Sequence, residues 1–483
     1  MVVSAIAEAI GVREDGFRLL LSMLAGYPLA AIHRSYFYKQ TPQVQHTFFL
    51  SAGVLLYIFN YGFTVYHALL STLFAYLITN FFAGSNHSVI LAHVAFLGHI
   101  LIGYMSAESS QYDITWTTPF CIMVLRYIGL VMDVFDGHNY ETAKPDQKLT
   151  GIRDKPSLLE IGAFGFFFAG TFVGPQFTLS RFRQFVNGEF LDEKTKDVRA
   201  SGLMPSLGRF VAGVTYLVLT QWSQVWIPAP DYFHSPEYLN MSFFWRWTWV
   251  TIWFRLTMAR YAAAWLITEG AAILAGLGYN GKDEKGEDRW DGVRDLHITG
   301  WELGTDYTSV VTSFNVGTNN FAKNHLFRRL RWLNSKMGAH GVTLLYLATW
   351  HGYHLGYFLL FGFEFGCMIA QEQLYHLISI TRGATAFLNQ QWMYPIKLIF
   401  GRIVINYSMA FGFLTFGLIK KELWWAPVKN LYFIGYLIYF VAWPLTYQVL
   451  LRIVPREPRK KEKTPDASKS APVSTAKESK KDL

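Results

Sequence analysis

The sequence predicts an all-α membrane protein with many transmembrane helices. Three observations carry this prediction: the composition, the long apolar runs, and the basic residues placed between those runs. Hydrophobic residues make up 52% of the 483 residues and charged residues 16%, whereas soluble domains carry roughly 25% charged residues. This composition excludes a disordered chain, and two cysteines are too few for a disulfide scaffold. The net charge is +9, and the basic residues flank apolar segments, which favours a membrane over a nucleic acid as partner.

Thirteen apolar runs are candidates for membrane spans, because about 20 helical residues cover roughly 30 Å of hydrocarbon. Several runs are short or contain an arginine, and we expect these to be re-entrant, tilted or interfacial. The arginines are Arg126, Arg246, Arg255 and Arg260. We therefore predict roughly ten to twelve true crossings of uneven length. The runs are 17–32, 47–61, 63–83, 88–105, 119–132, 158–174, 209–227, 241–258, 260–278, 341–362, 365–380, 395–419 and 430–454.

Three polar stretches interrupt these runs. Residues 133–155 form a loop of mixed charge, and residues 282–295 are so highly charged that we expect them to be solvated. Between Tyr307 and Phe363 there is no acidic residue, yet five basic residues cluster within fourteen positions. The positive-inside rule places this basic segment, residues 323–336, on the cytoplasmic side. Its basic residues are Lys323, Arg328, Arg329, Arg331 and Lys336.

The last residues differ in composition from the rest of the chain. We predict a membrane-embedded domain over residues 1–455 and a disordered cytoplasmic tail over 456–483, which is rich in Lys, Ser and Pro. Lys480 and Lys481 stand fourth and third from the end, which resembles the dilysine retrieval signal of endoplasmic-reticulum membrane proteins. The simpler alternative is one more lysine pair in a basic tail. Four apolar runs separate the basic segment from the tail, and an even number of crossings places both on the same side of the membrane. Lys420 and Lys421 would then lie on the opposite side, against the positive-inside rule.

Two histidines stand inside an otherwise apolar stretch, in Trp350-His351-Gly352-Tyr353-His354-Leu355-Gly356-Tyr357. Ionisable groups inside a membrane span are costly, so each one is a candidate for function. On a continuous helix His351 and His354 would share a face, with Gly352 and Gly356 on another stripe. A buried neutral imidazole can accept a proton. The alternative is a core histidine that bonds to a neighbouring helix.

A second polar cluster, Phe314-Asn315-Val316-Gly317-Thr318-Asn319-Asn320, stands just before the basic segment. Three amides and a threonine supply donors and acceptors at the end of an apolar stretch. Taken alone, this composition is typical of an ordinary polar turn or helix end.

Taken together, the two clusters resemble the membrane-bound O-acyltransferase family, and in particular its lysophospholipid branch. That branch carries a WHGxxxGY-type motif with the catalytic histidine and an asparagine upstream in an Asn-x-x-Thr context. Here His351 follows Asn315 by 36 residues, and Thr318 completes the upstream motif. The resemblance extends along most of the chain, with one departure: Phe314 stands where many relatives have Trp.

The resemblance implies roles for individual residues. His351 is the catalytic base and Asn315 its partner, with His354 and Thr318 as supporting residues. The implied reaction moves a fatty acyl group from acyl-CoA to the free sn-2 hydroxyl of a lysophospholipid, in phospholipid remodelling. The implied acceptor is lysophosphatidylcholine, with lysophosphatidylethanolamine and lysophosphatidylserine as lesser acceptors and polyunsaturated chains as donors. Acyl-CoA is then a co-substrate, and no permanently bound cofactor is expected.

The chemistry of these residue types agrees with those roles. An alcohol is a poor nucleophile, and a neutral imidazole in reach of its proton supplies general-base help worth roughly 10²–10⁴-fold. A carboxamide N–H can stabilise the oxyanion that forms, and the alternative role for Asn315 is to orient the reactants. We expect neither Cys121 nor Cys367 to sit near the motif, and the reaction requires no covalent acyl-enzyme.

The basic segment suits the phosphates of CoA, because guanidinium groups bind phosphate in a fork. We expect Lys323, Arg328, Arg329, Arg331 and Lys336 to contribute to acyl-CoA binding. The alternative is a topology signal that contacts anionic lipid headgroups.

Two other classes of protein fit the sequence less well than an acyltransferase. A membrane-embedded metal oxidase needs more histidine ligands than the pairs His351/His354 and His93/His99 provide, so no metal is expected. A polytopic lipid or solute transporter without acyl-transfer chemistry fits the many spans, but no repeated halves are visible and the histidine–asparagine pair would be unexplained. The sequence does not determine the oligomeric state.

Overall fold

The protein is described here by a computed structural model, which describes residues 2–108, 114–227 and 231–456. Within these ranges the regular structure is helical, and strand pairing is limited to three isolated bridges. The predicted all-α architecture is therefore confirmed. The predicted tail and its dilysine end, Lys480 and Lys481, lie outside the described residues, apart from Arg456.

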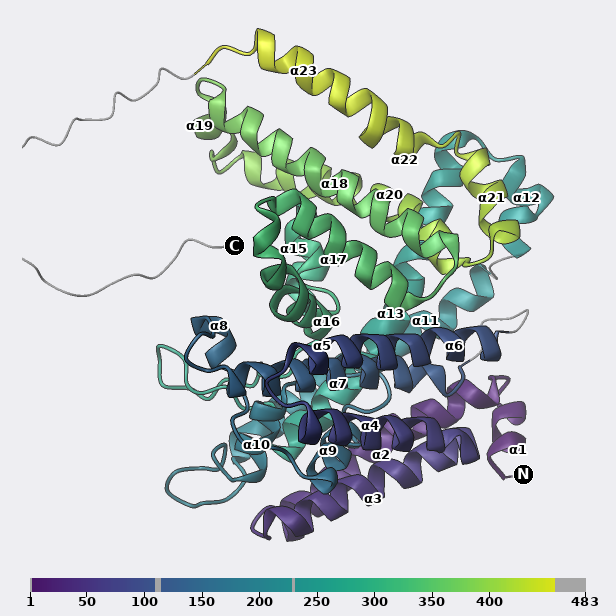
Figure 1. Cartoon of the computed structure of the whole chain (residues 1–483). Helices are drawn as coiled ribbons and strands as arrows, with labels where there is room; N and C mark the ends of the chain where they lie inside the picture. Colours follow the sequence, from purple (N-terminus) through teal and green to yellow (C-terminus); the bar gives the residue numbers. More distant parts are fainter. Residues whose placement is uncertain (1, 109–113, 228–230, 457–483) are drawn as a thin grey trace, which may run out of the picture.

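Long helices form the body of the molecule (Figure 1). Two of the spans include π-helical turns: α5 (Asn86–Ala92) continues through His93–Leu97 into α6 (Gly98–Ala107), and α22 (Ile434–Tyr436) continues through Leu437–Ala442 into α23 (Trp443–Ile453). The other long helices are α2 (Glu14–Ile32), α3 (Pro42–Tyr61), α4 (Val65–Phe81), α7 (Thr117–His138), α11 (Leu203–Trp226), α13 (Phe243–Ala275), α17 (Lys336–His351), α18 (Leu355–Ile380) and α20 (Met393–Gly417).

Six helical segments of the described chain are long and apolar enough to cross a membrane, judged by length and composition. The larger count of ten to twelve crossings stays a prediction. In the last of the six segments only 6% of the apolar window is buried in protein, so lipid is the solvent that suits its side chains. The six are Pro42–Phe81, Asn86–Ala107, Thr117–His138, Ala200–Trp222, Met393–Gly417 and Ile434–Ile453.

Three predicted boundaries are wrong. The runs 241–258 and 260–278 belong to the single 33-residue helix α13. The runs 341–362 and 365–380 are divided instead at Gly352, between α17 and α18. Asp133 and Asp136 belong to the buried end of α7 rather than to a loop, because ion pairs with residues far along the chain compensate their charges.

The predicted span 158–174 is helical only over α9 (Leu158–Gly165) and then turns within the protein interior. Arg126 of α7, 3% exposed, donates hydrogen bonds to the carbonyls of Gly165, Gly170 and Pro175 at 3.3, 2.8 and 3.0 Å. Irregular backbone at membrane depth is tolerated only where its polar groups are satisfied inside the protein. This arginine therefore stabilises a buried non-helical segment, which explains an arginine in an apolar run.

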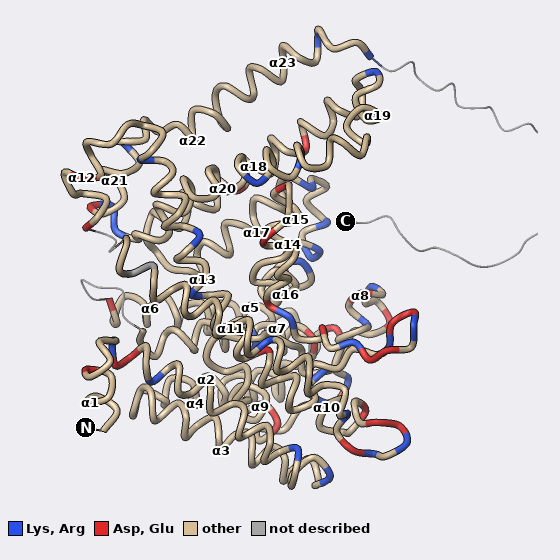
Figure 2. Tube along the Cα trace, turned by 180° about the vertical axis from the view of Figure 1, so that it is seen from behind, with Lys and Arg blue, Asp and Glu red and all other residues tan. Residues whose placement is uncertain are grey.

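Charged residues gather at one end of the bundle, around α8 (Pro145–Lys148) and α10 (Leu179–Val186), as Figure 2 shows. We call this the charged end. Lys336 contacts Glu372 of α18 at 3.4 Å, and the backbone N–H of Arg382 donates to Pro455 at 2.8 Å. The basic segment, the end of α18 and the last described residues therefore lie together, in agreement with an even number of crossings between them.

The opposite end, which we call the far end, contains the end of α6, the start of α7 and α21 (Lys421–Asn430). Here Lys420 contacts Glu108 at 3.4 Å. This contact reduces the conflict with the positive-inside rule, because the Glu108 carboxylate offsets part of the positive charge of Lys420 and Lys421.

Candidate active site

A large cavity of about 3160 Å³ runs through the middle of the molecule. Pockets for drug-sized ligands measure roughly 300–1,000 Å³, so this space suits lipid-sized substrates. Its walls come from α6, α7, α13, α17 and α18, with α14 (Ile298–Leu303), α15 (Tyr307–Val311) and α16 (Val316–Phe321). Lining residues reach from the basic segment at the charged end to Glu108 and Lys420 at the far end, and they include both His351 and Asn315.

The histidine motif lies at a break between two helices. Helix α17 ends at His351, Gly352 has φ 140°, and α18 begins at Leu355. A φ in this range favours glycine, because a Cβ is strained there. The predicted continuous helix with both histidines on one face is therefore wrong, since a glycine with a positive φ reverses the chain inside the motif.

The second glycine of the motif holds α18 against α20. A Cβ on Gly356 would lie 2.1 Å from the carbonyl oxygen of Thr415, so no larger residue fits. The Thr415 hydroxyl donates to the Gly356 carbonyl at 3.0 Å. Gly356 therefore allows close packing between the two helices.

His351 presents its ring to the cavity within a set of aromatic side chains. Its ring centroid lies 4.9 Å from that of Phe416, 5.5 Å from Phe361 and 5.9 Å from Tyr357. The neighbouring Trp350 is fixed by a hydrogen bond of 3.0 Å from Nε1 to the carbonyl of Cys121. Cys121, distant in sequence, thus lies beside the motif, contrary to the expectation. Among the described residues the His351 imidazole has no hydrogen-bond partner, so its ring nitrogens remain available to a substrate.

His354 has different neighbours. Its Nε2 lies 3.4 Å from Glu108 Oε1, and its ring stacks on Tyr353 with centroids 4.6 Å apart. Tyr353 also donates to the second oxygen of Glu108. That hydrogen bond, together with Lys420 and His354, lowers the pKa of Glu108. His354 therefore belongs to a polar cluster beside His351 and does not contact His351 in the described contacts.

Asn315 occupies a left-handed turn at the start of α16, with φ 53° and ψ 46°. Asparagine is among the few residues other than glycine that adopt this conformation readily. Its side chain lines the cavity and has no hydrogen-bond partner among the described residues. Thr318, one turn later, is buried and lines the same cavity. The amide is therefore exposed to a ligand in the same space as His351.

Two residues hold Asn315 in place: Asp295, which the sequence did not indicate as a site residue, and Asn319 of the predicted polar cluster. The buried Asp295 carboxylate accepts a hydrogen bond from the backbone N–H of Gly317 at 2.8 Å. The backbone carbonyl of Asp295 accepts one from the backbone N–H of Val316 at 3.0 Å. Asn319 Nδ2 donates to the carbonyls of Val311 and Phe314 at 2.7 and 2.9 Å. These bonds fix the backbone on both sides of Asn315.

Asp295 also corrects the expectation that residues 282–295 are solvated. Its side chain is 2% exposed, and burial raises its pKa to about 7. Trp290 and Val293 are buried as well, so only the first half of the stretch is exposed. The many charged residues of the stretch predict exposure, so the burial of Asp295 could not be inferred from them. It depends on a helix N-terminus that is formed by residues further along the chain.

The residue before the asparagine packs into an aromatic corner. Phe314 lies 4.2 Å from Trp301 and 4.7 Å from Trp265 between ring centroids. The Phe314 ring therefore fills a space between these two tryptophans.

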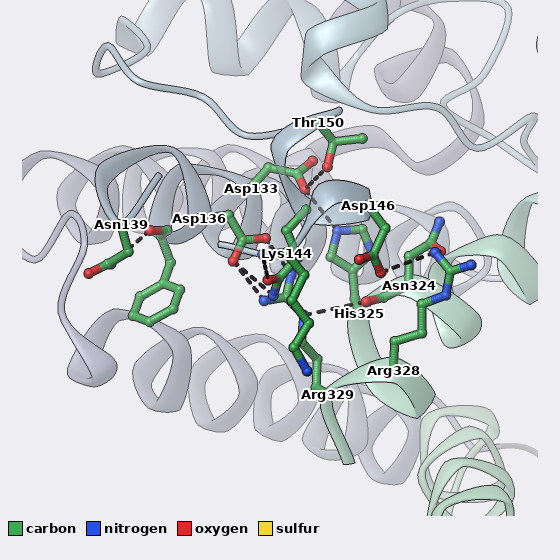
Figure 3. Close-up of polar contacts among 12 residues, drawn as sticks. Asp133, Asp136, Asn139, Lys144, Asp146, Thr150, Asn324, His325, Arg328 and Arg329 are labelled. Atoms are coloured by element: carbon green, nitrogen blue, oxygen red, sulfur yellow. Dashed lines mark hydrogen bonds and ion pairs between the residues drawn. The ribbon is translucent and has the colours of Figure 1, made fainter. Parts of the chain in front are cut away.

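The basic segment divides into residues that face the cavity and one that does not. Lys323, Arg328, Arg331 and Lys336 line the cavity, whereas Arg329 binds the buried Asp136 of α7 through both of its terminal nitrogens (Figure 3). Arg328 is shared, because it also contacts Asp146 and Asn324, each at 3.1 Å. Nearby, His325 Nε2 lies 2.9 Å from Asp133, which accepts from Thr150. Arg329 therefore joins the segment to α7 instead of facing the cavity.

The other histidines that were weighed as metal ligands have separate contacts. His93 Nδ1 bonds to the carbonyl of Val89 at 2.8 Å, and His99 pairs with His67 at 2.9 Å. Neither contacts the His351 motif in the described hydrogen bonds.

Comparisons with known proteins identify the family. The family model for the membrane-bound O-acyltransferase family matches residues 101–389, more than half of the chain. This chain belongs to the membrane-bound O-acyltransferase family. It is 61% identical to lysophospholipid acyltransferase 5 of Caenorhabditis elegans over 460 residues, which cover 95% of this chain and 97% of that protein. It is 32% identical to the Homo sapiens protein of the same name over 462 residues (94% and 93%), and 25% identical to a Schizosaccharomyces pombe lysophospholipid acyltransferase over 449 residues (90% and 86%).

The predicted family is therefore confirmed, and the roles of His351 and Asn315 stay predictions. The wording around FNVGTNN, WHGYHLGY and the FGFEF run also predicts a resemblance to lysophosphatidylcholine acyltransferase 3, but the relatives above do not carry that name. The relatives above carry the broader name lysophospholipid acyltransferase, which specifies no headgroup.

Proposed function

We propose that this chain transfers a fatty acyl group from acyl-CoA to the free sn-2 hydroxyl of a lysophospholipid, with lysophosphatidylcholine as the main acceptor. The observation that carries the proposal is that His351 and Asn315 line one cavity and that neither side chain has an internal hydrogen-bond partner in the described structure. The names of the relatives support the substrate class, since they are lysophospholipid acyltransferases.

In this proposal His351 is the general base. A neutral ring nitrogen takes the proton of the sn-2 hydroxyl while its oxygen attacks the thioester carbonyl carbon. The tetrahedral oxyanion accepts a hydrogen bond from the Asn315 amide. When the C–S bond breaks, the proton passes from the imidazolium to the CoA thiolate, so the base returns to its neutral form. Thr318 and His354 act as supporting residues on the cavity wall.

Acyl-CoA approaches from the charged end, where Lys323, Arg328, Arg331 and Lys336 meet its phosphates. Helix α17 spans 16 residues from Lys336 to His351, about 24 Å. The long pantetheine arm suits this distance, because it separates the phosphates of CoA from its thioester. Acyl-CoA is a co-substrate, and the reaction requires no permanently bound cofactor.

The proposed location is the endoplasmic-reticulum membrane with the charged end and the tail in the cytoplasm. The basic segment and the last described residues share one end of the bundle, as the positive-inside rule requires of cytoplasmic segments. Replacing Lys480 and Lys481 by Ser then releases the protein to later compartments. An unchanged distribution would contradict the retrieval role.

Purified protein incubated with labelled acyl-CoA and a panel of lysophospholipids tests the function. We expect labelled phospholipid and free CoA in equal amounts, fastest with lysophosphatidylcholine, and no product with His351→Ala. If no lysophospholipid gives product while the purified protein moves labelled lipid across vesicles, the chain is a transporter and the proposal fails.

A further inference from the structure

Four polar side chains from separate parts of the chain meet at the far end of the cavity. Glu108 follows α6, Tyr353 and His354 belong to the break between α17 and α18, and Lys420 lies between α20 and α21. All four line the cavity. Glu108 Oε1 lies 3.4 Å from both His354 Nε2 and Lys420 Nζ, and Tyr353 donates to the other oxygen. We call these residues the far-end cluster.

The far-end cluster is accessible to a ligand. The side chains of His354, Lys420 and Glu108 retain 24%, 32% and 34% of their exposure, although they contact one another. Figure 1 shows the ends of α6 and α21 on the same side of the bundle, away from α8 and the basic segment. Arg13, Asp15, Asp231 and Arg260 also line the cavity, and Arg13 pairs with Asp15.

The far-end cluster is close to the reacting atoms. Tyr353 and His354 follow His351 by two and three residues, so their backbones lie at most about 11 Å from that of His351. In a lysophospholipid the phosphate is attached to the carbon next to the one that bears the sn-2 hydroxyl. When that hydroxyl reaches His351, the headgroup therefore has to lie within a few bonds of it.

The other mouth of the cavity is already assigned to the acyl donor under the proposed function, on which this inference rests. The charged end offers Lys323, Arg331 and Lys336 to the phosphates of CoA. A headgroup that approached from that side would compete for the same cations. The acceptor headgroup therefore belongs at the far end.

The charges of the far-end cluster match a zwitterion. Lys420 and the His354 ring can donate to a phosphate, while Glu108 attracts a cation. Aromatic faces attract quaternary ammonium groups, and the ring centroids of Tyr353 and Tyr357 lie 4.6 and 6.2 Å from that of His354. In the free protein the charges of Glu108 and Lys420 compensate each other. When a zwitterion binds, its phosphate pairs with Lys420 and its ammonium group with Glu108, so the net charge of the site does not change.

We propose that the far-end cluster is the headgroup subsite of the acceptor, in which Lys420 and His354 bind the phosphate and Glu108 with Tyr353 binds the positively charged amine. The subsite selects lysophospholipids that carry both charges over those that carry only the phosphate. Glu108 is the residue that makes this selection, because the phosphate is common to every headgroup class.

The decisive experiment compares two acceptors in the full-length protein: lysophosphatidylcholine, which has a cation, and lysophosphatidylglycerol, which has none. Glu108→Gln removes the carboxylate charge and with it the ion pair between Glu108 and Lys420. We expect the ratio of kcat/KM for the choline acceptor to that for the glycerol acceptor to fall about tenfold or more, as for the loss of one charge-assisted contact. The KM for acyl-CoA stays unchanged. Equal losses for both acceptors, or no loss, would overturn the proposal.

Lys420→Gln provides a second, independent variant. It raises the KM of both acceptors and leaves the KM of acyl-CoA alone, because it removes a phosphate contact at the far end only. Lys421→Gln and Glu422→Gln are matched controls, since both residues are exposed and neither lines the cavity. An unchanged acceptor KM in Lys420→Gln would reject the phosphate contact. A wild-type protein that acylates no lysophospholipid would reject the proposed function itself, which is a different outcome.

Discussion

Arg329 and Asp136 form a two-point ion pair between the basic segment and α7. Arg329 Nη1 donates to Asp136 Oδ1 at 2.6 Å, and Nη2 donates to the second oxygen. The Asp136 side chain is 3% exposed, and Arg329 retains 21%. The pair joins residues 193 positions apart in the sequence. It therefore fixes the basic segment to the wall that α7 forms.

Arg329→Gln should destabilise the protein, because it leaves the Asp136 carboxylate buried without its partner. Breaking a buried ion pair costs about 3–5 kcal/mol, and the partial exposure of Arg329 favours the lower end. We expect a clear fall in Tm and in the yield of folded protein in detergent. Arg331→Gln is the matched control. The Arg331 side chain is 51% exposed and lies as far as 4.0 Å from Asp146, so the loss of this weak contact should leave the Tm at the wild-type value. Equal Tm values for both variants would contradict a structural role for Arg329.

Neutralising the cavity-facing basic residues should weaken the binding of acyl-CoA. The triple variant Lys323→Gln, Arg331→Gln, Lys336→Gln removes three exposed charges that line the cavity and keeps Arg329 in its ion pair. Each charge-assisted contact contributes roughly 1.5–3 kcal/mol, so the KM for acyl-CoA should rise at least about tenfold. The KM for the lysophospholipid should change little. If both KM values stay constant while membrane orientation changes, these residues act as a topology signal.

Sequence alone was sufficient for the helical class, the family and the two residues that share the cavity. It was insufficient where contacts distant in sequence decide the outcome. The break at Gly352 is one example, because the apolar run continues through the motif and only the left-handed φ of the glycine ends the helix. The burial of Asp295 is another, since its carboxylate meets the N–H of Gly317 from a later helix.

The ion pair of Arg329 illustrates the same limit. Five basic residues in one short segment look equivalent in the sequence, and their count favours a shared role. The distinction comes from Asp133 and Asp136, which end α7 on its buried side and bind His325 and Arg329. Two acidic residues three positions apart at the end of an apolar run were the available signal.

Two glycosylation sequons, Asn86-His87-Ser88 and Asn240-Met241-Ser242, should report the orientation of the bundle. Asn86 begins α5 at the charged end, where Asn139 donates to the carbonyl of Gly84 at 2.9 Å. Asn240 follows α12 (Pro236–Leu239) at the far end, where His234 bonds to the carbonyl of Leu423 at 3.0 Å. With the charged end in the cytoplasm, only Asn240 meets the glycosylation machinery in the lumen. Asn240→Gln should then remove a glycan that Asn86→Gln leaves in place, and a glycan on Asn86 would invert the orientation.

Gly352→Ala should disturb the motif without removing a catalytic group. The residue has φ 140°, and a Cβ would lie 2.9 Å from Tyr357 Cε2, beside the ring that neighbours His351. Holding an alanine in this conformation costs about 1–3 kcal/mol, so both Tm and kcat should fall. Gly362→Ala is the control, because Gly362 is an exposed helical residue with open space around it. Its Tm should stay the same or rise, since alanine favours a helix by roughly 1 kcal/mol over glycine.

The catalytic pair can be tested as a unit. His351→Ala should lower kcat by at least about 10²-fold, as expected for the loss of a general base. Asn315→Ala should lower it by about 10²–10³-fold, as for the loss of one oxyanion donor. His351 has no internal hydrogen-bond partner in the described structure, so His351→Ala should keep a Tm close to the wild-type value. Asn315→Ala should lower the Tm modestly, because the left-handed conformation at φ 53° costs an alanine roughly 1–2 kcal/mol.

The double variant separates a concerted pair from two independent effects. If base and oxyanion donor act in the same transition state, the double loss should be much smaller than the product of the single losses. His354→Ala should raise the KM of the lysophospholipid more than it lowers kcat, because His354 contacts Glu108 and lies outside the ring set around His351. An inactive His354→Ala beside a largely active His351→Ala would assign the base to His354. Full activity in all of these variants would leave His351 as a buried histidine of the core and reject the proposed chemistry.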